Sequence, residues 1–88
     1  MSIPKMSGDD GTVAVANGSL TRKFHTAIVN EADTVITALY YSKDTSFATN
    51  LVSDLGLSGL ALGAGQVIYC KGGETFGKIT VTGSVLTQ

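Results

Sequence analysis

The chain has no tryptophan, and it has only one cysteine, one proline and one histidine among its 88 residues. A single cysteine cannot form a disulfide within the chain, and Cys70 lacks the CxxC or Cys/His companions of a zinc site. The sequence therefore predicts neither a disulfide framework nor a metal, and nothing in it indicates a cofactor. An unpaired cysteine is also typical of a protein that is synthesised in a reducing cytoplasm.

Charge is equally scarce. Charged residues make up 15% of the chain, against about 25% in an average domain. The formal net charge is −1 and the six basic residues are scattered, so the basic stripe that nucleic-acid binding requires is absent from the sequence. The longest uncharged stretch, before Lys71, is interrupted by several glycines and predicts no membrane span. Because 43% of residues are hydrophobic, we expect part of the apolar surface to contact another chain.

The first eleven residues differ in composition from the rest. They contain the only proline and the sequence Gly-Asp-Asp-Gly at 8–11, which favours turns and offers little to bury. We interpret residues 1–11 as an extended N-terminal arm and residues 12–88 as a single domain. The arm residues that we expect to contact a partner are Ile3, Pro4 and Met6.

From Thr12 onward, short segments with strand-like alternation are separated by glycine and polar turns. Asn17-Gly18 is typical of a tight hairpin turn, and residues 43–56 predict either a short helix or an irregular loop. Residues 76–82 and 84–88 read as two separate strands divided by Gly83. Such a pattern predicts an all-β fold, a small single-domain β-sandwich or barrel of about six to seven short antiparallel strands.

Alternation along these segments also predicts which side chains form the core. A β-bulge at Gly77 would allow Phe76 to share one face with the residues that follow it, while Lys78, Thr80 and Thr82 point to solvent. The predicted core residues are Phe24, Ile28, Leu39, Ile68, Phe76, Ile79 and Val81.

The strand expected at residues 34–42 is apolar on both faces, which predicts that both faces are buried and that a second group of residues packs over the strand. Its own loop and a neighbouring subunit are both compatible with that pattern. We assign Tyr40 and Tyr41 as candidate contacts to a neighbour.

Few residues offer chemistry. His25 has no serine or cysteine nearby in sequence to activate, and the period of its strand places Cys70 with Ile68, as a packing residue. We therefore predict no enzymatic activity. Tyr40, Tyr41 and Tyr69 leave a second hypothesis open, a platform on which a carbohydrate stacks.

Three segments carry a resemblance to a known class of proteins. FHTAIVNEADTVITAL at 24–39, GLSGLALGAGQVIY at 56–69 and GGETFGKITVTGSV at 72–85 follow one another in an order that resembles small virion proteins of tailed bacteriophages. The resemblance covers residues 20–88 and lies in the pattern of segments. The final Thr-Gln departs from it, since such chains often end in an aromatic or apolar residue.

The resemblance implies a structural subunit that is displayed on the virion after synthesis in the host cytoplasm. It implies a homo-oligomer, with a trimer favoured, bound to the major capsid protein or to another virion protein as a capsid decoration or head-fibre component. The alternative is a carbohydrate-binding or adhesion module on a head fibre or tail appendage.

Overall fold

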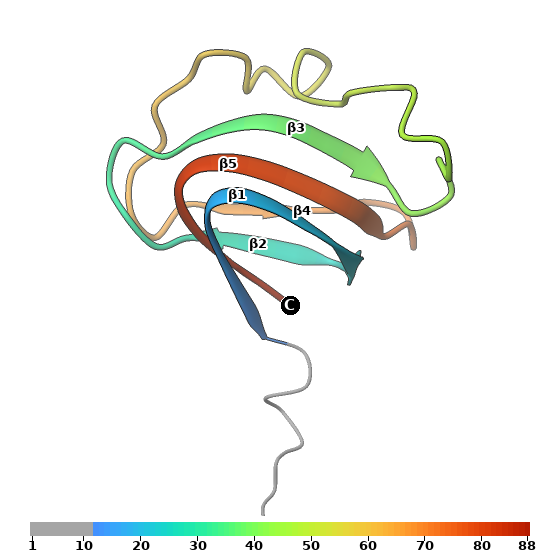
Figure 1. Ribbon diagram of the computed structural model, residues 1–88, viewed down its shortest axis with the longest axis horizontal. Coiled ribbons are helices and arrows are strands. Elements are labelled where there is room, and N and C mark those ends of the chain that lie inside the picture. The colour runs from blue at the N-terminus through green and yellow to red at the C-terminus, as the bar shows by residue number, and fades with distance from the viewer. Residues whose placement is uncertain (1–11) are drawn as a thin grey trace, which may run out of the picture.

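The computed structural model describes residues 12–88, and all regular structure in this range is antiparallel β-sheet (Figure 1). The strands are β1 (Val13–Phe24), β2 (Thr26–Val29), β3 (Val35–Tyr41), β4 (Val67–Tyr69) and β5 (Phe76–Thr87). No helix occurs between residues 12 and 88, so residues 43–56 form the loop alternative. The all-β prediction is confirmed.

The five strands belong to one open sheet, organised around β5. β1 pairs with β5 along its whole length, while the other side of β5 pairs first with β3 and then with β2, which in turn pairs with β4. The expectation of six to seven short strands in a sandwich or barrel is wrong. β1 and β5 are each 12 residues long, and each continues through a glycine that we had interpreted as a turn.

Both long strands bend where they face each other. Asn17 has a φ of 47° and Gly83 a φ of 111°, and the Gly83 N–H donates a 2.9 Å hydrogen bond to Asn17 Oδ1. Thr34 lies beneath this bend with no exposed surface, where its Oγ1 accepts from the Ser84 N–H at 3.2 Å and donates to the Glu31 carbonyl at 2.8 Å. Asn17 therefore lies within a continuous strand, opposite a bulge that Thr82 and Gly83 form on β5, and the predicted hairpin turn at Asn17-Gly18 is wrong.

Gly77 occupies a second irregular position. Tyr40 and Tyr41 of β3 pair with Lys78 and Phe76, which leaves Gly77 as an extra residue on β5 relative to β3. A Cβ at Gly77 would lie 2.7 Å from the Cα of Ser42, so only glycine fits. Phe76, Ile79 and Val81 consequently share the buried face of β5.

Other changes of phase redistribute the predicted core. The chain bends at His25, so Ala27 and Val29 face inward while Ile28 is only half-buried. In β3, a bulge at Thr37 places Ile36 and Leu39 on the same face, although they are three residues apart. Strict alternation fails at both places because one residue is added between two inward-facing side chains.

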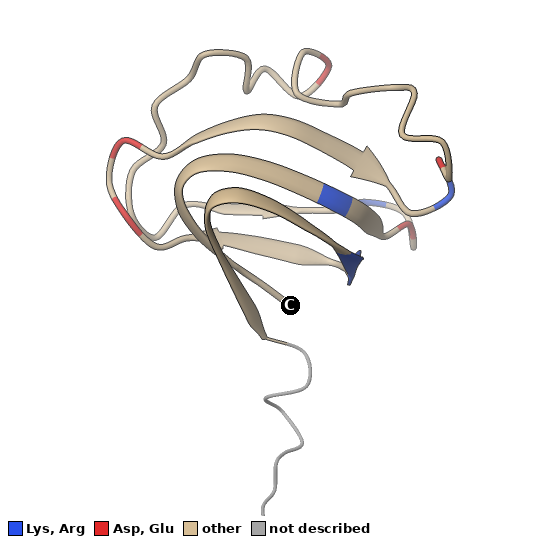
Figure 2. Cartoon of the chain, in the orientation of Figure 1, with Lys and Arg blue, Asp and Glu red and all other residues tan. Residues whose placement is uncertain are grey.

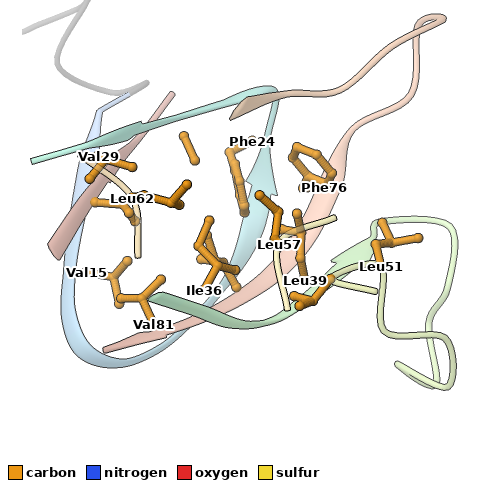
Figure 3. Close-up of a cluster of buried hydrophobic side chains, with 14 of the residues drawn as sticks. Val15, Phe24, Val29, Ile36, Leu39, Leu51, Leu57, Leu62, Phe76 and Val81 are labelled. Atoms are coloured by element: carbon orange, nitrogen blue, oxygen red, sulfur yellow. The ribbon is translucent and has the colours of Figure 1, made fainter. Parts of the chain in front are cut away.

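The core lies in the concavity of the bent sheet (Figure 3). Phe24 and Phe76 pack with ring centroids 5.3 Å apart, and Leu39, Ile79 and Val81 are buried beside them. Ile68 is half-buried and packs against this cluster from β4.

The segment between β3 and β4 supplies the cover. It contributes the buried side chains Leu51, Val52, Leu57 and Leu62, and Figure 3 shows Leu57 and Leu62 pointing into the cluster. Leu62 and Thr34 exchange two backbone hydrogen bonds of 3.2 and 2.8 Å, and Asn50 bonds to Leu39 and Thr37. The segment therefore closes the outer edge of β3 as well as the core.

Candidate functional site

The residues that the sequence assigned to contacts do not gather at one place. Ile3, Pro4 and Met6 lie outside the described residues. Tyr40 is half-buried on the outer face of β3, where its ring centroid lies 5.4 Å from that of Phe47. Tyr41 turns inward and stacks on Phe76 with centroids 6.2 Å apart.

Tyr69 lies on β4, where it is 62% exposed, and it lines a small cavity together with Tyr41. The structure therefore brings Tyr41 and Tyr69 together but separates Tyr40, so the three tyrosines do not form one platform. The physical reason is that adjacent residues of a strand point to opposite faces, which separates Tyr40 from Tyr41 on β3.

A different hollow lies at the end of the molecule where β1 and β3 end and β5 begins. We call it the Phe47 hollow; its volume is about 270 Å³. It is lined by Thr21, Arg22, Lys23, Ser42, Thr45, Phe47 and Gly77. Thr21 and Phe24 pair with Lys78 and Phe76, so two basic residues of β1 face the single residue Gly77 of β5. This bulge places Arg22 and Lys23 side by side at the hollow.

Phe47 is held in an uncommon conformation at the hollow. Its φ is 51°, in the left-handed region that bulky side chains rarely occupy. The Asp44 carboxylate fixes the turn by accepting hydrogen bonds from the N–H groups of Ala48 at 3.2 Å and Thr49 at 2.9 Å. Those two bonds hold the pKa of Asp44 below its ordinary value, since they stabilise the ionised carboxylate.

Positive charge concentrates at the same end of the molecule (Figure 2). The ammonium of Lys78 lies 5.1 Å from the centroid of the Phe47 ring, within the range of a cation–π interaction. Lys43 similarly lies 5.2 Å from the Tyr41 ring and forms a 3.4 Å ion pair with Glu74. Among residues 12–88, none of those that line the Phe47 hollow is acidic.

A smaller cavity of about 100 Å³ lies nearer β4. Its lining includes Leu55 and Tyr69, both exposed, and the buried Cys70 and Phe76. Burial is the main cause that raises the pKa of the Cys70 thiol, which keeps it protonated and unreactive. This environment agrees with Cys70 as a packing residue.

The outer side of β1 is an open sheet edge within the described residues. Thr26 and Gln88 exchange backbone hydrogen bonds of 3.0 and 2.8 Å, so the backbone groups of Gln88 point toward β2. Successive residues of a strand direct their N–H and C=O groups to opposite sides, so those of Thr87 point toward β1, where Thr87 pairs with Val13. By the same alternation Ala14 directs its N–H and C=O away from the sheet. Residues 13–21 contain no charge and no proline, the usual devices that prevent an edge from pairing.

His25 is exposed at the bend between β1 and β2, and its Nδ1 lies 3.4 Å from the Thr26 hydroxyl. No carboxylate contacts its ring in residues 12–88. The same residues hold no cluster of three or more metal-ligating side chains. Nor does the described part of the chain contain a helix with the length and hydropathy of a membrane span.

The Phe47 hollow was not predicted from the sequence. In the sequence, Phe47 is one residue of the segment 43–56, which predicts a helix or a loop, and Arg22 and Lys23 are two of the six scattered basic residues. The available signal was the sequence Asp44-Thr-Ser-Phe, because an aspartate that bonds to backbone N–H groups a few residues ahead is typical of tight turns. Comparisons of the chain with protein-family models, curated proteins and solved structures found no match.

Proposed function

We propose that this protein is a non-enzymatic structural subunit of a tailed-bacteriophage particle, which decorates or stabilises the capsid as a homo-oligomer. The sequence resemblance provides the class of protein. The open β1 edge carries the proposal on the structural side, because residues 13–21 carry no charge and their outer backbone groups have no strand partner within residues 12–88. Such an edge is suited to contact with a second copy of the chain.

Exposed apolar side chains support the same proposal. Four large apolar residues are each between 45 and 62% exposed: Leu55, Leu60, Val67 and Tyr69. Only 15% of the residues of the chain are charged. Each contact of a 9.0 kDa subunit is small, so attachment to the major capsid protein or another virion protein would gain strength from a closed oligomer. The resemblance favours a trimer.

Proline at position 14 tests the edge. Because the Ala14 N–H points away from β5, Ala14→Pro removes no hydrogen bond within residues 12–88 but blocks pairing with another strand. We expect the variant to fold, as judged by circular dichroism and thermal unfolding, and to sediment at a lower mass than wild type. Ala14→Val, which keeps the N–H, is the control. Equal sedimentation of Ala14→Pro and wild type would place the contact elsewhere.

The proposed particle attachment requires a separate experiment. Deletion of residues 1–11 should leave a folded domain that no longer co-sediments with particles lacking the protein, since we assign the arm to the shell contact. If the full-length protein fails to bind such particles, the virion proposal is wrong. If the truncated protein binds as tightly as the full chain, the arm makes no contribution.

A carbohydrate-binding module on a head fibre or tail appendage is the second candidate, and the Phe47 hollow favours it. The hollow combines an aromatic side chain with the hydroxyls of Thr21, Ser42 and Thr45. Aromatic rings and hydroxyl groups are the side chains that bind the apolar faces and polar edges of sugars.

A further inference from the structure

Three structural irregularities meet at the Phe47 hollow. Phe47 has a left-handed backbone, two residues of β1 form a bulge opposite Gly77, and Gly77 is itself an extra residue relative to β3. Strained backbone and β-bulges both concentrate at functional sites, where they aim particular side chains. Their coincidence around one hollow indicates a site that is arranged before its ligand arrives.

The turn that carries Phe47 is fixed from both sides. The Phe47 N–H donates to the Asp44 carbonyl at 3.0 Å, and the Asp44 carboxylate bonds to the two residues that follow Phe47. The Phe47 ring itself is packed against Tyr40 and lies under the Lys78 ammonium. Because the Phe47 ring is already held in place, ligand binding would not lose entropy by ordering it.

The charge of the lining selects the ligand. Lys23 contributes a cationic side chain, and none of the residues between 12 and 88 that line the hollow is acidic, while Lys78 adds a positive charge close to the ring. The Lys23 side chain is exposed and thus accessible. A ligand with a carboxylate would form charge-assisted hydrogen bonds here, which are about twice as strong as neutral ones.

We propose that the Phe47 hollow binds an acidic monosaccharide unit, a pyranose that bears a carboxylate. The proposal rests on the second candidate function and specifies its ligand class. The volume of about 270 Å³ lies just below the range of roughly 300–1,000 Å³ for drug-sized ligands and suits one sugar ring. The carboxylate would face Lys23, and the ring hydroxyls would face Thr45.

Amide chemical-shift titrations of the full chain test this assignment with three probes: glucuronate, glucose and acetate. We expect glucuronate to bind with a millimolar dissociation constant and to shift the amide signals of Thr45 and Phe47. Glucose and acetate should each bind about tenfold more weakly, because each lacks one of the two groups that the hollow recognises.

The three probes separate the two levels of the proposal. Equal affinity for glucose and glucuronate would overturn the acidic specificity and leave a carbohydrate site. Acetate that binds as tightly as glucuronate would overturn saccharide recognition and indicate a plain carboxylate site. If none of the probes shifts these amides, both the inference and the carbohydrate function are wrong.

Two variants provide the residue-level test. Lys23→Gln should weaken glucuronate binding about tenfold, whereas Lys71→Gln removes the same charge outside the hollow and should leave the affinity unchanged. Phe47→Asn removes the ring but keeps a residue type that tolerates the left-handed turn, so it should abolish binding in a folded protein. Equal affinities for the two lysine variants would overturn the assignment.

Discussion

Gly83 should be the least replaceable glycine of the sheet, because it combines an uncommon backbone with the closest packing. Its φ is 111°, and a Cβ at this position would overlap Thr34 Oγ1 and lie 2.9 Å from the Thr34 Cα. A non-glycine residue in such a conformation costs about 1–3 kcal/mol. Overpacking against a backbone that cannot move adds about 1–3 kcal/mol.

Gly83→Ala should therefore lower the free energy of unfolding by about 2–6 kcal/mol, which approaches the whole stability of a small domain. The loss has a clear structural cause, since relief of the overlap would separate β5 from Thr34 and break the hydrogen bond from the Ser84 N–H. Urea denaturation followed by circular dichroism measures this free energy.

Gly73 provides the matched control. Its φ of 79° is also positive, but a Cβ there would have no atom within 4 Å. Gly73→Ala should consequently cost only the conformational part, about 1–2 kcal/mol. If the two variants lose equal stability, the packing of Thr34 under the bend makes no contribution and the description of the sheet corner is wrong.

Three further predictions address the core, the Phe47 turn and the buried thiol. Phe76→Ala should lower the free energy of unfolding, measured by urea denaturation, by about 3–5 kcal/mol because the ring is buried against Phe24. Thr82 is exposed, so Thr82→Ala should change this free energy by no more than about 0.5 kcal/mol. Similar losses in the two variants would contradict the core assignment. Because folding lowers the pKa of Asp44, the ionised carboxylate stabilises the fold fully above its ordinary pKa near 3.8, and this stabilisation is lost as the pH falls through the lower, folded-state pKa. The melting temperature of wild type should therefore exceed that of Asp44→Asn at higher pH, and the difference should disappear in this acid range. A difference that stays constant with pH would refute the role of the carboxylate. Cys70 should react with iodoacetamide at pH 8 far more slowly in the folded protein than in urea, and equal rates would show that the thiol is accessible.

The fold class could be predicted because strand-like alternation and glycine turns recur along the chain. The number of strands could not, because the same residues that end a strand can also bend one. Asn17-Gly18 and Gly83 are typical turn sequences, but here each bends a continuous strand, and the two bends stabilise each other through one hydrogen bond. That bond joins residues 66 positions apart, so local sequence carries no sign of it.

The same limit explains which core residues were predicted. Phe76, Ile79 and Val81 could be grouped because a glycine within an alternating strand signals a bulge. Ile28 was assigned inward because no glycine or proline marks the bend at His25. Phe47 could not be recognised as part of a hollow, since the site depends on β1 and β5 residues that the fold brings to its turn.

The measurement that bears most directly on a self-assembling structural subunit is sedimentation equilibrium of the purified full-length protein at micromolar concentrations. The proposal predicts a closed oligomer, with a mass that is a fixed multiple of 9.0 kDa and stays constant as the protein is diluted through this range. A mass of 9.0 kDa at every concentration would show that the chain is a monomer and would contradict the proposed function.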